Sequence, residues 1–387
     1  MALTASPKAW RRTAALQGAT FTIPFFLGFV LFSVVPIVLA LRESVFTEKS
    51  SGLGFGPKTV EFAGPDNFLR GVADAKFWAG MGRVGLFAAI SIPLIQIVSV
   101  VMALLLDAAS RRVAARFRLP LLIPYMIPGI VATLIWIYLY SPDVGPLAPF
   151  FALLGIDADF YSGELIWVSI GNLVAWGAIG FNMLIVYADL QSVPREIFES
   201  ARVDGASEPR IAWSIKVPMI RRSLVLTTVL SIIGTLQIFS DPMLFRSMTP
   251  ETITRDFTPI MAIYDWAFAQ GDFNYAAALS VILALVVGRL LPPHRQGTHL
   301  MTTATTAKRP AAPAGWHTRP NEARTKVAVI AGLVAFTVYS VAPVWWLVVA
   351  ATKSQSDLYT TNALWSAEFR LWDNLRGLFS PTRTGSS

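Results

Sequence analysis

The chain has 387 residues, of which 54% are hydrophobic and only 14% are charged. A soluble domain carries about 25% charged residues, so this composition predicts a membrane protein that contacts a lipid bilayer. The absence of cysteine excludes disulfides and thiolate metal sites. The net charge of +8 does not indicate nucleic acid binding, because the basic residues lie in segments that flank apolar runs.

Seven apolar segments are long enough to cross a bilayer, which takes roughly 20 residues per helix. We therefore predict an all-α polytopic fold, with a six-helix bundle followed by a flexible linker and a seventh transmembrane helix. Pro120, Pro124 and Pro128 are expected to kink the third helix, because proline removes a backbone donor. The predicted spans are 20–41, 81–106, 119–140, 165–188, 223–245, 274–291 and 327–350.

Lysine and arginine predict the orientation of these spans, because they are enriched in cytoplasmic loops. The 190–222 loop has six basic residues, whereas segment 141–163 has none. Segments rich in basic residues alternate along the chain with segments poor in them, and the 42–80 loop is the exception. Long loops carry less weight in this rule. The N-terminus and the 190–222 loop are thus expected in the cytoplasm.

Composition also predicts the division of the chain. The segment after the sixth span is rich in Pro, Ala, Thr and Gly, which is typical of a flexible linker. Its three histidines lack the spacing of metal ligands, and no metal or cofactor is expected. The predicted parts are a cytoplasmic tail (1–18), a six-span domain (19–292), a linker (293–325), an extra transmembrane helix (326–351) and an outer polar tail (352–387).

Motifs of common enzymes are absent from the sequence. The nearest match to a phosphate-binding loop, at 54–59, has the wrong spacing, and neither a GxSxG elbow nor an HExxH helix occurs. The chain is therefore not expected to be an enzyme, and it should not hydrolyse ATP itself.

The inner parts of the predicted spans carry no ionisable residue. Neither Asp, Glu, Lys, Arg nor His occurs within 84–106, 119–140, 165–188, 223–240, 274–288 and 327–350. Carriers coupled to protons or sodium usually keep an ionisable residue at membrane depth. Segment 223–240, for example, has none. Neutral amides, hydroxyls and aromatic rings suit a neutral polyhydroxylated ligand, although the same residues also form hydrogen bonds between packed helices. The candidates for a substrate pathway are Asn172, Trp176, Asn182, Thr235 and Gln237.

The 190–222 loop predicts a small ordered structure. Pro194 is expected at the first position of a short helix that Ser192 caps, and Asp204-Gly205 ends this helix in a tight turn. Ser207 is expected to cap a second short helix, and Pro218 to mark its end. The alternative is an amphipathic segment on the membrane surface, which the acidic residues of the loop disfavour.

This loop resembles the cytoplasmic signature loop of ABC-importer permeases, in which E-A-A-x-x-D-G-A precedes aromatic residues and I-x-L-P. Ser200, Ala212 and Val217 depart from that pattern. The resemblance implies that the loop docks on a cytoplasmic ABC ATPase dimer, with Glu199 pairing with a basic group and Gly205 forming the interhelical turn. The positions that carry it are Glu199, Ala201, Asp204, Gly205, Ala206, Trp213, Ile215 and Pro218.

Other segments extend the resemblance to the maltose-type sugar branch of these binding-protein-dependent permeases. "FAGPDNFLR" at 62–70 and "FNYAAALSVILALVV" at 273–287 are similar to conserved parts of that branch. "VYSVAPVWWLVVAATKSQSDLY", at 338–359, resembles the beginning of the second permease type. The chain is therefore expected to join one permease to the first span of its partner. A shifted reading frame and a truncated sequence are the alternatives to a true fusion, and a regulatory extra helix is a further alternative.

The resemblance implies a transmembrane subunit that imports a sugar or oligosaccharide by alternating access, driven by ATP hydrolysis in a partner subunit. Its implied partners are the ATPase dimer, a second permease subunit and an extracytoplasmic solute-binding protein. The alternative function is a secondary carrier or channel for a neutral polar solute. The residues do not identify the sugar.

Overall fold

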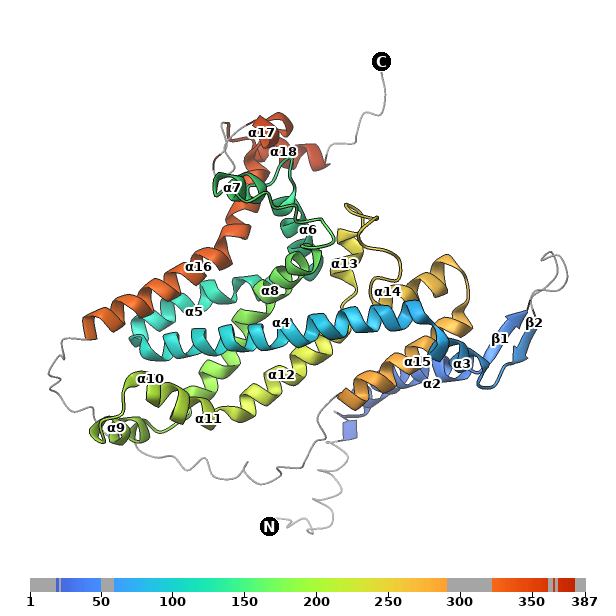
Figure 1. The fold of residues 1–387 in the computed structure, drawn as a ribbon, viewed down its shortest axis with the longest axis horizontal. Helices are drawn as coiled ribbons and strands as arrows, with labels where there is room; N and C mark the ends of the chain where they lie inside the picture. The colour runs from blue at the N-terminus through green and yellow to red at the C-terminus, as the bar shows by residue number, and fades with distance from the viewer. Residues whose placement is uncertain are drawn as a thin grey trace, which may run out of the picture. The chain divides into compact units, whose positions relative to one another are not determined.

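A computed structural model of the chain is almost entirely helical (Figure 1). In the part of the chain that it describes, six helices are long and apolar enough to cross a membrane, and a bent pair raises the number to as many as seven. The predicted all-α polytopic fold is confirmed. The described residues are 19–20, 22–49, 59–290, 322–360, 365 and 368–379.

The predicted tail (1–18) and most of the predicted linker (293–325) lie outside the described residues. Each predicted span corresponds to a helix or a broken helix. The second begins earlier than predicted, at Ala75, because Asp74 Oδ1 accepts the N–H groups of Lys76 and Phe77 and so caps the helix. The spans are Thr22–Glu43, α4 (Ala75–Ala108), α5 with α6 (111–140), α8 (Ile166–Leu190), Arg221–Phe245, α15 (Phe273–Leu290) and Lys326–Thr352 within α16 (Glu322–Thr352).

The third span differs most from its prediction. It starts at Arg111, where the Ser110 hydroxyl accepts the N–H of Val113, and it bends by 94° between α5 (Arg111–Met126) and α6 (Gly129–Tyr140). Pro128 disfavours the helical conformation of Ile127, whose ψ is 131°. The predicted third span, 119–140, is therefore a bent pair of helices, and Pro128 breaks the helix that Pro120 and Pro124 leave continuous.

The fifth span is also broken. α12 (Arg221–Leu236) ends at Gln237, and α13 (Ser240–Phe245) follows after two more residues. Irregular backbone at membrane depth is tolerated where protein or water satisfies its polar groups. This break is a structural feature that the hydropathy of the segment did not indicate.

The chain divides into two compact units, residues 1–81 with 255–290 and residues 82–254 with 291–387. In the first unit, an antiparallel hairpin places Phe46 opposite Phe62, with ring centroids 5.6 Å apart. The sequence analysis did not predict this hairpin. The elements of the unit, besides α15 and the start of α4, are a π-helical segment (Val30–Val34), α2 (Val35–Glu43), β1 (Phe46–Lys49), β2 (Thr59–Phe62), α3 (Asp66–Ala73), α14 (Pro259–Tyr264) and a π-helical segment (Asp265–Ala269).

α3 packs tightly on α15 in this unit. A Cβ atom at Gly71 would lie 2.7 Å from Ile282 Cδ1, so a larger residue would require the Ile282 side chain to shift. Beside it, the Arg70 guanidinium lies 3.7 Å from the ring centroid of Tyr275 and forms an ion pair with Asp272 at 2.9 Å. These contacts anchor the 42–80 loop to the sixth span.

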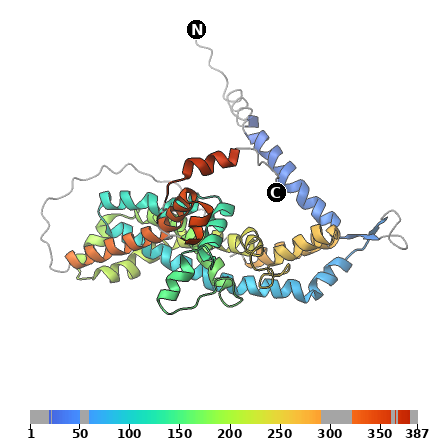
Figure 2. The ribbon, with the colours of Figure 1, turned by 90° about the horizontal axis from the view of Figure 1, so that it is seen from above.

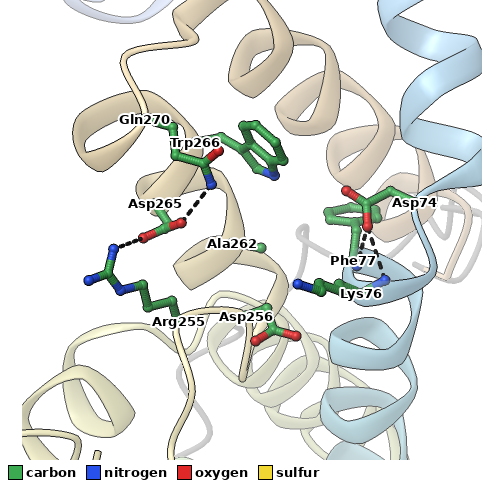
Figure 3. Close-up of a pocket in the computed structure, with 9 residues that line it drawn as sticks. All are labelled: Asp74, Lys76, Phe77, Arg255, Asp256, Ala262, Asp265, Trp266 and Gln270. Atoms are coloured by element: carbon green, nitrogen blue, oxygen red, sulfur yellow. Dashed lines mark hydrogen bonds and ion pairs between the residues drawn. The ribbon is translucent and has the colours of Figure 1, made fainter.

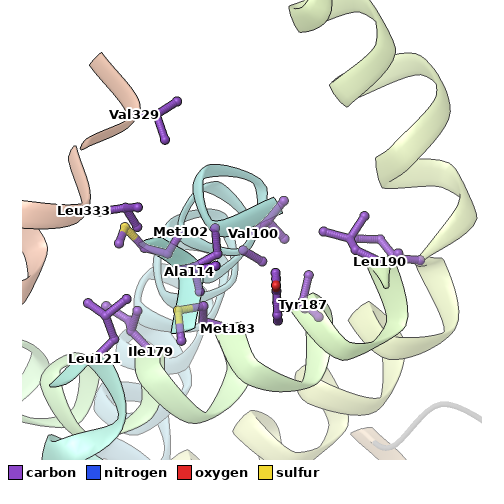
Figure 4. Close-up of a cluster of buried hydrophobic side chains, with 14 of the residues drawn as sticks. Val100, Met102, Ala114, Leu121, Ile179, Met183, Tyr187, Leu190, Val329 and Leu333 are labelled. Atoms are coloured by element: carbon purple, nitrogen blue, oxygen red, sulfur yellow. The ribbon is translucent and has the colours of Figure 1, made fainter. Parts of the chain in front are cut away.

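The second unit is built around a cluster of buried apolar side chains from α4, α5 and α8 (Figure 4). α5 and α8 approach closely at Gly180, where a Cβ atom would overlap the carbonyl oxygen of Leu121. The remaining elements of the unit are α7 (Leu147–Leu153), α9 (Arg195–Val203), α10 (Glu208–Ile211), a π-helical segment (Ala212–Lys216), α11 (Val217–Met219), α17 (Gln355–Thr360) and α18 (Leu371–Phe379).

The seventh helix, α16, is part of the second unit and packs along α5 and α6 (Figures 1 and 2). Val329 and Leu333 enter the same buried cluster as Leu121. At its C-terminal end, the Asn374 amide donates to the carbonyl oxygens of Ala351 and Lys353 at 2.8 and 2.9 Å. These bonds satisfy carbonyl groups that the end of a helix leaves unpaired.

Candidate functional site

The 190–222 loop folds as the two short helices that the sequence predicted, α9 and α10, joined at Gly205. Gly205 has φ +84°, so it adopts the left-handed conformation expected of a glycine turn. The N–H of Gly205 donates to the carbonyl of Arg202, and the N–H of Ala206 donates to the carbonyl of Ala201. This pair of bonds is a Schellman motif, and it ends α9 in a defined geometry.

The predicted caps of the two helices were partly wrong. Ser192 does not cap α9, because its hydroxyl donates to the carbonyl oxygen of Asp189 at 2.7 Å. Pro194 occupies the capping position itself, and α9 starts at Arg195. Ser207 stands at the capping position of α10 with extended backbone, but its side chain makes no capping bond. Pro218 lies inside α11, before α12 begins at Arg221.

An ion pair connects the two short helices across the turn. Arg202 Nε lies 2.6 Å from Glu208 Oε1, and the two side chains are 40% and 54% exposed. The hydrogen bond from Arg202 lowers the pKa of the Glu208 carboxyl, and Glu208 in turn raises the pKa of Arg202. Because the pair is exposed, its contribution to stability is below about 1 kcal/mol.

The loop buries one side and presents the other. Phe198 and Ile211 are buried, whereas Val203 is 88% exposed at the end of α9. Of the eight residues predicted to meet an ATPase, Ala201, Ala206 and Ile215 are half-buried. The exposed members are Glu199, Asp204, Gly205, Trp213 and Pro218.

Two of the five residues proposed for a substrate pathway contact the seventh helix. The indole of Trp176 is buried and donates to the carbonyl oxygen of Ser340 at 3.1 Å. Asn172 accepts a hydrogen bond from the hydroxyl of Tyr339 at 2.9 Å and donates to that of Tyr140 at 2.8 Å. Both polar groups therefore form hydrogen bonds between packed helices. This is the role that the sequence analysis named as the alternative to substrate binding.

The other three candidates lie on α8, on α12 and at the break that follows α12. Asn182 is buried and donates to the Ser231 hydroxyl at 3.4 Å, and Thr235 is buried near the end of α12. Gln237 is exposed at the break between α12 and α13. Gln237 is the exposed member of the five candidates, and the substrate pathway stays a prediction.

The broken fifth span holds an acidic residue that sequence reasoning missed. The charge-free segment of the sequence analysis, 223–240, stops one residue before Asp241, although the predicted span 223–245 and the observed span Arg221–Phe245 both include this residue. The Asp241 carboxylate accepts a hydrogen bond of 2.6 Å from the buried Thr133 hydroxyl of α6. The signal that could have found it is an acidic residue directly after an apolar run.

A cavity of about 490 Å³ lies in the first unit, between the start of α4 and segment 255–270 (Figure 3). Arg255 and Asp265, two of the charged residues that line it, form an ion pair. Asp265 accepts from Arg255 at 3.3 Å and from Gln270 at 2.9 Å, and Asp74 accepts from the Tyr275 hydroxyl at 2.8 Å. These bonds cross-link the segments that form the cavity wall.

The fold and the ordered loop define a polytopic helical membrane protein with a folded hairpin between its fourth and fifth spans. The sequence profile of the family described as "Binding-protein-dependent transport system inner membrane component" matches residues 99–292. The chain belongs to this family, and the 190–222 loop lies inside the matched region. Residues 293–387 lie outside it.

Relatives of known assignment match along most of their length. The diacetylchitobiose uptake system permease protein NgcF of Streptomyces coelicolor is 30% identical over 297 residues, which cover 71% of this chain and 81% of the relative. The lactose transport system permease protein LacF of Rhizobium radiobacter is 26% identical, with 74% and 95% of the two chains covered. The sn-glycerol-3-phosphate transport system permease protein UgpA of Agrobacterium fabrum is 27% identical, with 67% and 86% covered.

The fold is also similar to a solved structure. A chain of a bacterial ABC transporter involved in the import of the acidic polysaccharide alginate superimposes with a TM-score of 0.62 at 18% identity. The match covers 73% of this chain and 96% of that chain. At this identity the similarity establishes the shared fold.

Proposed function

We propose that this protein is a transmembrane subunit of an ABC importer for a neutral sugar or oligosaccharide. The observation that carries the proposal is the folded 190–222 loop, whose Schellman turn at Gly205 presents Glu199, Asp204 and Val203 on one exposed surface. Family membership supports it, because relatives bear names of sugar uptake systems. The inner parts of the spans lack cations, for example segment 223–240, which favours a neutral solute over a phosphate ester.

The proposed mechanism divides binding from catalysis. A cytoplasmic ABC ATPase dimer holds the 190–222 loop and hydrolyses ATP, and closure of that dimer moves the spans between inward- and outward-open states. This chain supplies the pathway and the docking surface. It is not itself an enzyme, and neither a metal nor another cofactor is assigned to it.

The other proposed partners are a second permease subunit and an extracytoplasmic solute-binding protein. A bacterial alginate ABC transporter of similar fold was solved in complex with a periplasmic protein bound to alginate pentasaccharide. This structure supports the solute-binding protein as a partner by analogy. We place the chain in the bacterial inner membrane with its N-terminus in the cytoplasm. We keep the division into a six-span domain (19–292), a linker (293–325), an extra helix (326–351) and an outer tail (352–387) as part of this proposal.

Uptake measurements test the proposal directly. Membrane vesicles that contain this chain with its ATPase and second permease are expected to take up radiolabelled lactose or diacetylchitobiose only when ATP and the solute-binding protein are supplied. Vanadate, which traps ABC ATPases, should stop uptake. Uptake that a pH gradient drives without ATP would favour the secondary carrier instead.

The orientation has a separate test, which uses the absence of cysteine from the chain. Val203→Cys places one thiol on the exposed surface of the loop. A membrane-impermeant maleimide should label it in inside-out vesicles and not in intact cells. Labelling in intact cells would contradict the cytoplasmic assignment.

A further inference from the structure

A buried ion pair connects the 190–222 loop to the second span. Lys216 Nζ lies 2.5 Å from Asp107 Oδ2, and the two side chains are only 8% and 14% exposed. Asp107 is the second-last residue of α4, and Lys216 ends the π-helical segment that follows α10. The pair therefore bridges elements that are 109 residues apart in the sequence.

Two further contacts extend the pair to α8 and α9. The other carboxylate oxygen of Asp107 accepts from the side-chain amide of Gln191, at the C-terminal end of α8, at 2.8 Å. Lys216 Nζ lies 5.1 Å from the ring centroid of the buried Phe198 of α9. We define Asp107, Gln191, Phe198 and Lys216 as the loop anchor.

Electrostatics makes this anchor different from the apolar contacts around it. Apolar contacts are non-directional, so side chains such as Ile211 and Ile220 can slide while staying buried. Separating a buried ion pair leaves an uncompensated charge, which strongly opposes the separation. A link of this kind stays closed when force is applied to the loop.

We propose that Asp107 and Lys216 are positioning residues that transmit movement of the 190–222 loop to α4. They act through the spans and do not touch the ATPase or the solute. The inference rests on the proposed function, because it assigns the loop to a moving partner. It predicts that breaking the pair uncouples ATP hydrolysis from transport while the complex still assembles.

The test compares transport per ATP hydrolysed in proteoliposomes that contain the complete transporter. Asp107→Asn and Lys216→Met are each expected to lower this ratio at least about tenfold, because each leaves the other buried charge without its partner. The exchanged pair Asp107→Lys with Lys216→Asp should recover a large part of it. Glu368→Gln, which removes the exposed ion pair with Arg370 outside the 190–222 loop, is the matched control and should stay within about twofold of the wild type.

If the single variants fail to assemble, a second measurement tests whether the link between Asp107 and Lys216 couples transport to ATP hydrolysis. The chain has no cysteine, so Asp107→Cys with Lys216→Cys can be joined by a short bis-methanethiosulfonate reagent and released by reduction. Higher transport per ATP in the joined form would support the inference. Equal ratios in the joined and released forms, or single variants that assemble and couple normally, would overturn it. Absence of ATP-dependent uptake in the wild type would instead contradict the proposed function.

Discussion

The polar residues of the spans and those of the 190–222 loop have different structural roles. In the spans, Asn172 and Trp176 are neutral, and their hydrogen bonds go to neighbouring helices. In the loop, the charged Arg202 and Glu208 pair in the presence of water, while Val203 is exposed. Polar groups at membrane depth must be satisfied internally, whereas a loop in water can leave surface for a partner. The difference indicates that the spans use polarity for packing and the loop uses it for shape.

The largest expected effect comes from the close approach of α5 and α8. Gly180→Leu places side-chain atoms where the Leu121 carbonyl lies, so we expect a loss of stability of about 3 kcal/mol or more. Gly177→Leu is the matched control, because nothing lies within 4 Å of its Cβ position. The measurement is the unfolding midpoint of the detergent-solubilised protein, and equal midpoints for the two variants would contradict the packing described here.

A smaller effect is expected at the turn of the loop. Gly205→Val forces a β-branched residue to φ near +84°, a strain of about 1–3 kcal/mol. The strain is local, so uptake should fall while the unfolding midpoint of the spans changes little. Gly205→Asn should keep most of the uptake, because asparagine tolerates this conformation. Uptake by the valine variant at the wild-type rate would show that the turn geometry does not matter.

The bond between Trp176 and the seventh helix should contribute less. Trp176→Phe leaves the Ser340 carbonyl without its donor and should cost about 1 kcal/mol. Trp213→Phe, at an exposed position, should leave the unfolding midpoint unchanged. The control repeats the Trp176→Phe substitution in a chain that lacks residues 322–387, which include α16. If the substitution still lowers the unfolding midpoint there, the bond to α16 is not the source of the loss.

The smallest effect belongs to the exposed ion pair, and it depends on pH. The pKa of Glu208 is lowered in the folded loop, so its contribution is present above the unfolded pKa of the carboxyl and is lost as pH falls through the folded pKa. Removal of the pair by Glu208→Gln should cost less than about 1 kcal/mol near neutral pH and nothing in strong acid. A larger loss of stability in acid than at neutral pH would contradict the lowered pKa of Glu208. Unfolding midpoints over a range of pH provide the measurement.

Periodicity and composition predicted the features that depend on local chemistry. Hydropathy located the spans because every span must satisfy the same bilayer thickness. The Asp204-Gly205 turn was also predicted correctly, because the left-handed conformation at Gly205 is a local requirement. The docking role of the loop and the substrate pathway stay predictions.

Only the tertiary structure decided the contacts between distant segments. Hydropathy did not reveal the 94° bend before α6, the Asp241–Thr133 bond or the seating of α16 on α5. Lys216 counted in the sequence as one more basic loop residue, yet it pairs with Asp107 in a buried site. A sequence states which residues are apolar or charged, but the partner of each buried polar group depends on which helices meet, and that is decided by packing over the whole chain.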